Sequence, residues 1–67
     1  MEISRKLGHK QGIASALNGI GRIHYGKGEY DEALKRYEES LEISRKLGDQ
    51  PGIADTLEKI NSVKKKL

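Results

Sequence analysis

The chain has 67 residues and a formal net charge of +3; hydrophobic and charged residues make up 34% each, and its only aromatic residues are three tyrosines. This length allows one domain at most, and the absence of cysteine excludes disulfides and thiolate metal sites. No stretch reaches the roughly 18 apolar residues of a membrane span, and no signal peptide precedes the charged start, so we expect a soluble, cytoplasmic protein with no membrane partner.

The chain contains an internal repeat. The sequence EISRKLG stands at residues 2–8 and again at residues 42–48, and GIASAL at 12–17 corresponds to GIADTL at 52–57. With a shift of 40, residues 1–27 match residues 41–67 at twelve positions. The chain therefore holds about one and two-thirds copies of a 40-residue unit.

Apolar residues recur with helical spacing along the whole chain, and no segment alternates with period two. We predict a helical stump at 1–7, a helix at 11–26, a second helix at 29–47 and a final helix at 51–66. Such short connections make neighbouring helices antiparallel. The fold class predicted is therefore all-α, built from helix-turn-helix units.

The predicted helix ends have recognisable signals. Acidic residues crowd the first turn of 29–47, and Gly48 is suited to end that helix in the left-handed conformation. Asp49 offers an N-cap oxygen for the last helix, and Pro51 fits its first turn. The first copy of the repeat has His9 and Gln11 at these two places, so we expect a weaker helix start there.

Residues 14–47 resemble a tetratricopeptide repeat, a helix-turn-helix unit that stacks into α-solenoids. The stretch GEYDEAL at 28–34 matches the family's turn into its second helix. The 40-residue spacing is similar to the extended variant of regulatory and adaptor arrays. The resemblance implies a packing set in which small residues let helices approach closely and larger ones wedge between them: Leu17, Ile20, Gly21, His24, Ala33, Tyr37 and Ser40.

The resemblance also implies a function. In this family the first helix of each unit lines a concave surface that holds an extended peptide or a partner helix. The corresponding residues here are Ser15, Asn18, Gly19, Arg22, Tyr25, Lys59 and Ser62, with Asp55 and Glu58 also on the last helix. We expect a non-catalytic protein-binding module that needs no cofactor.

Other chemistry is poorly supported by the sequence. The glycines of residues 19–28 do not fit a dinucleotide fingerprint, since His24 stands where a glycine is required, and no Walker Gly-Lys-Ser/Thr occurs. The two histidines lack a third ligand, and no serine has a His and a carboxylate at catalytic spacing. Lysines 64–66 have no interleaved aromatic residue for stacking bases. We therefore expect that the protein is not an enzyme and that it binds neither a metal ion nor nucleic acid.

A second interpretation is a structural unit whose main partner is itself. Fewer than about three repeats rarely close a stable core. The stump at 1–7 is too short to cover the helix at 11–26, so we expect exposed apolar surface along that seam. A homo-oligomer would then form through exposed seams or through exchange of a terminal helix.

Overall fold

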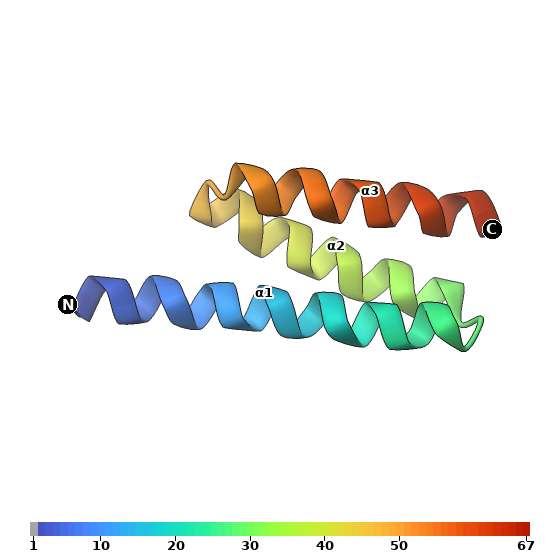
Figure 1. The fold of residues 1–67 in the computed structure, drawn as a ribbon, viewed down its shortest axis with the longest axis horizontal. Coiled ribbons are helices and arrows are strands. Elements are labelled where there is room, and N and C mark those ends of the chain that lie inside the picture. Colours follow the sequence, from blue (N-terminus) through green and yellow to red (C-terminus); the bar gives the residue numbers. More distant parts are fainter. Residues whose placement is uncertain (1) are drawn as a thin grey trace.

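The computed structural model describes residues 2–67, with side chains described from His9 onward, and consists of three α-helices. They are α1 (Glu2–Gly26), α2 (Tyr30–Leu47) and α3 (Gln50–Lys66). Each helix runs antiparallel to the one before it, and α2 lies in the middle, packed against both α1 and α3 (Figure 1). The predicted all-α helix-turn-helix architecture is confirmed. None of the described helices is long and apolar enough to cross a membrane.

The first helix corrects one prediction. We expected a break between a stump at 1–7 and a helix at 11–26, but α1 is continuous from Glu2 to Gly26, and Met1 lies outside the described residues. The missing signals explain the difference, because His9 and Gln11 supply neither a capping carboxylate nor a proline. As a result α1 extends past the other two helices at its N-terminal end (Figure 1).

Both turns use a glycine with positive φ. Gly28 has φ of +82°, and the next residue, Glu29, donates its backbone N–H to the carbonyl of His24 at 2.8 Å. Gly48 has φ of +69° and ends α2 in the left-handed conformation, as its position in the sequence predicts. Asp49 then accepts a hydrogen bond from the backbone N–H of Gly52 at 3.3 Å and caps α3.

The core lies along α2. Ala33 and Tyr37 on α2 form a buried cluster with Ile60 and Val63 on α3. Four half-buried residues surround this cluster: Tyr25, Tyr30, Leu34 and Leu41. Because α2 contributes to both contacts, its packing fixes how α1 and α3 lie relative to each other.

Candidate protein-binding face

The contact between α1 and α2 depends on bare backbone at Gly21. A Cβ atom at this position would lie 2.7 Å from Cε1 of Tyr37, closer than side chains approach one another. Gly21 is buried, and the ring of Tyr37 occupies the space that a side chain at Gly21 would fill. The small residue at Gly21 therefore lets the two helices approach closely.

Two further small residues of the expected packing set are buried. Ala33 and Ser40 are both fully buried on α2. The hydroxyl of Ser40 donates a hydrogen bond to the backbone carbonyl of Ala14 on α1 at 3.0 Å. A polar group in the helix interface is thereby satisfied and ties the two helices together.

Not every residue of the expected packing set is buried. Leu17 and His24 are half-buried, whereas Ile20 lies at the surface. The expectation that Ile20 packs inside is not met, because none of the described helices lies on that side of α1. Ile60, at the same place in the second copy of the repeat, is buried against α2.

Charged side chains of both α1 and α3 influence the pKa of Tyr37. Burial raises the pKa of the Tyr37 phenol, and the positive charges of Lys59 and Arg22 partly oppose that rise. Tyr25 and Asp55 lie close enough to push the same pKa slightly upward. Residues of α1 and of α3 thus meet electrostatically at one side chain of α2.

The polar groups on this face differ in how well they are satisfied. Lys59 donates a hydrogen bond to Asp55 at 2.7 Å, one turn away on α3. Arg22 is exposed and forms no ion pair with any side chain from His9 onward. The side-chain oxygen of Asn18 is buried and has no hydrogen-bond partner among the described residues. A buried oxygen without a donor costs about 1–3 kcal/mol, and a bound partner would satisfy it only after the Asn18 side chain turns outward.

Other expected binding residues are less constrained. Ser15, Gly19 and Ser62 are exposed, and the structure gives them no specific contact with one another. Arg22 lines a shallow hollow of about 340 Å³ together with Gly19 and Ile23. Tyr25 packs edge-on against Tyr30, with ring centroids 5.4 Å apart, which holds its ring in place.

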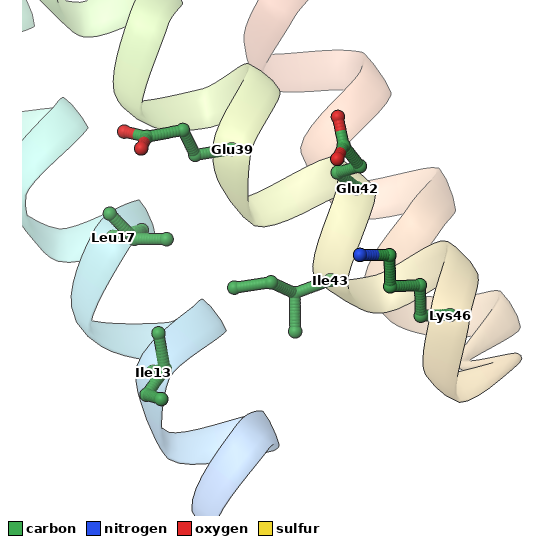
Figure 2. A pocket seen from close by; sticks show the side chains of 6 residues that line it. All are labelled: Ile13, Leu17, Glu39, Glu42, Ile43 and Lys46. Carbon is green, nitrogen blue, oxygen red and sulfur yellow. The ribbon is translucent and has the colours of Figure 1, made fainter.

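Two features of this region are not predicted by the sequence. The sequence predicted only that Tyr37 fills space, yet charged groups of α1 and α3 also influence its pKa. These groups come from different helices, so the residue spacing within one helix does not reveal them. The second feature is an apolar hollow of about 360 Å³ between α1 and α2. Figure 2 shows Ile43 of α2 pointing toward Ile13 and Leu17 of α1, with Glu39, Glu42 and Lys46 around the rim.

The histidine at the first turn has a structural partner. Nδ1 of His24 lies 2.5 Å from the carboxylate of Glu29, which precedes α2. This hydrogen bond is the main cause that holds the pKa of Glu29 below its ordinary value. Among the side chains from His9 onward, no three of His, Asp or Glu are grouped so that they could hold a metal ion.

Comparison with known proteins agrees with this geometry. A family model described as tetratricopeptide repeat matches residues 1–60. No curated protein and no solved structure shows a significant match to the chain. Tetratricopeptide repeats are typically non-catalytic and mediate protein–protein interactions. With a family match over most of its length and three antiparallel helices packed through small residues, the chain belongs to the tetratricopeptide repeat family.

Proposed function

We propose that the chain is a non-catalytic binding module that holds an extended segment of another protein. The segment would lie on the surface that α1 and α3 share, which we call the α1–α3 face and which carries Asn18, Arg22, Tyr25 and Lys59. The observation that supports this most directly is that α1 and α3 both pack against α2, with Arg22 and Lys59 each near enough to Tyr37 to oppose the rise in its pKa that burial causes. Helices α1 and α3, which contact each other little, thus both bring polar side chains to the region of Tyr37. A segment lying across this face would contact both.

The side chains suggest what such a segment offers. Arg22 has a planar group with several donors and no anionic partner from His9 onward, so it suits a carboxylate. The side-chain oxygen of Asn18 is buried without a donor, and it would accept a backbone N–H of the segment once the side chain turns outward. Tyr25 supplies a flat apolar surface held by Tyr30. Ser15, Gly19 and Ser62 would line the remainder of the face. We therefore propose an extended peptide that carries at least one acidic side chain or a free carboxyl end.

This proposal is tested with a peptide selected from a random library against the whole chain. Arg22→Ala should weaken binding of that peptide about tenfold or more, because it removes a charge-assisted hydrogen bond. Lys35→Ala removes an exposed cation from α2 and serves as the matched control. Isothermal titration calorimetry would measure both. Equal affinity for both variants, or an equal loss, would contradict the proposed face.

Self-association is the second candidate, and it is compatible with the first. The exposed isoleucines of α1 favour it, since uncovered apolar residues on one helix face commonly mark an interface. We propose a homo-oligomer formed through the seam of α1, or by exchange of a terminal helix, in a cytoplasmic setting.

A further inference from the structure

The apolar stripe of α1 is exposed, whereas the same stripe of α3 is covered. Ile13, Ile20 and Ile23 are 41%, 43% and 59% exposed. Forty residues later stand Ile53, which is half-buried, and Ile60 and Val63, which are 5% and 0% exposed. Helix α2 covers the stripe of α3, whereas none of the described helices covers Ile20 or Ile23, and Ile13 lies at the edge of the hollow between α1 and α2. Because the corresponding stripe of α3 packs against a helix, the stripe of α1 is suited to pack against one as well.

The segment of α1 that carries most of the stripe is uncharged. Residues 11–21 contain no Asp, Glu, Lys, Arg or His, in a chain of which 34% is charged. A partner recognised by ion pairs would find none to make over these three turns of helix. The surface that packs on this segment is therefore expected to be apolar.

The spacing of the stripe makes it complementary to itself. Positions 13, 16, 20 and 23 follow the alternating three- and four-residue steps of a helix pair, and they are placed symmetrically about residue 18. An antiparallel helix aligned on residue 18 therefore sets Ile13 opposite the partner's Ile23 and Ala16 opposite the partner's Ile20. Such a contact is isologous, as in two-fold dimers.

A row of glycines runs beside the stripe. Gly12, Gly19 and Gly26 are seven residues apart, and a Cβ atom on any of them would meet nothing within 4 Å. A glycine inside a helix costs about 1 kcal/mol relative to alanine, and nothing within the described chain requires one at Gly19. Bare backbone there would let a second helix come close.

We propose that two molecules of this protein associate through α1, antiparallel and aligned on residue 18, to form a two-fold dimer. The dimer specifies the self-association proposed above and does not depend on peptide binding. Ile20 lies about 160° around the helix axis from Arg22, so Arg22, Tyr25 and Lys59 stay free in the dimer, whereas Gly19 borders both surfaces.

The contact is small. Residues 9–26 span about 27 Å of helix, and a single helix pair of this length lies near the lower limit of about 1,000 Å² for a specific interface. We therefore expect a reversible dimer whose population rises with concentration across the micromolar range.

Sedimentation equilibrium of the whole chain from micromolar to millimolar concentration tests the proposal. The wild-type chain should pass from monomer to dimer, and Ile20→Lys should stay monomeric because it places a charge at the centre of the stripe. Leu57→Lys changes a residue of α3 that is 41% exposed and is the matched control, which should dimerise like the wild type. A wild-type chain that stays monomeric throughout would overturn the proposal, as would an Ile20→Lys variant that still dimerises.

A disulfide measurement tests the alignment. The chain has no cysteine, so Gly19→Cys introduces a single thiol next to the two-fold axis. It should form a disulfide-linked dimer under mild oxidation much faster than Glu38→Cys, which places a thiol on the exposed side of α2. Equal rates would exclude the antiparallel alignment.

The two proposals fail separately. Ile20→Lys should bind the selected peptide with wild-type affinity while losing the dimer. If the chain never dimerises but Arg22→Ala still loses the peptide, the dimer is wrong and the binding function stands. If the dimer forms and no peptide is bound at the α1–α3 face, the reverse holds.

Discussion

Gly21 is the residue on which the packing of α1 against α2 depends most directly. Its missing side chain leaves room for the ring of Tyr37, whose pKa is influenced by the charges of Arg22 and Lys59. Two further small residues of α2, Ala33 and Ser40, are fully buried, so a larger side chain at either position would meet no free space. A change at Gly21 is therefore expected to affect both the core and the candidate binding face.

Gly21→Ala should destabilise the fold by about 1–3 kcal/mol, because the added methyl group overlaps a buried aromatic ring. The usual gain of about 1 kcal/mol from replacing a helical glycine only partly offsets this overlap. Gly12→Ala is the control, since its Cβ meets nothing within 4 Å, and it should be neutral or stabilising. Urea unfolding of dilute protein, followed by circular dichroism, measures both. An unchanged or raised stability for Gly21→Ala would contradict the close contact.

At the scale of the helix, local signals decide where each element begins and ends. Gly28 and Gly48 both adopt positive φ, and Asp49 caps α3, so these boundaries follow from residues whose chemistry is visible in the sequence. The helix start expected near residue 11 is absent because the signals for it are missing. Residues 2–8 and 42–48 are identical, but the residues that follow them differ. A repeat predicts a turn only where the turn residues are repeated as well.

This explanation predicts that the missing turn can be restored. The double change His9→Asp and Gln11→Pro gives the first copy of the repeat the cap and the proline of the second. It should break α1 near residue 8, because proline inside a helix costs about 3 kcal/mol and removes a hydrogen bond. His9→Asp alone is the control and should leave α1 continuous. Backbone chemical shifts of residues 8–10 report the outcome, and helical values in the double variant would refute the explanation.

At the scale of the whole molecule, the sequence predicted the class of fold and the family but only part of the surface. Periodicity and the repeat were sufficient for three antiparallel helices. The exposure of Ile20 was harder to foresee, because it depends on whether a neighbouring helix is present rather than on the residue itself. The position of Tyr37 among charges from α1 and α3 likewise depends on how three helices cross, which spacing within one helix does not specify.

The molecule presents two surfaces that lie on different sides of α1. One carries Arg22 and Tyr25 and continues onto α3 at Lys59, and we assign it to an extended partner. The other carries Ile13, Ile20 and Ile23, and we assign it to a second molecule. The separation matters because a repeat module that pairs through its seam would present two binding faces in one particle and gain avidity for a partner with two matching segments.

The most direct test of the proposed function is a map of amide chemical shifts on binding the selected peptide. We predict that the largest changes fall on residues 15–25 of α1 and 55–62 of α3, centred on Asn18, Arg22, Tyr25 and Lys59. The exposed side of α2, at Glu38 and Glu42, serves as the internal reference and should change little. Changes concentrated on that side of α2, with none on α1 and α3, would contradict the account.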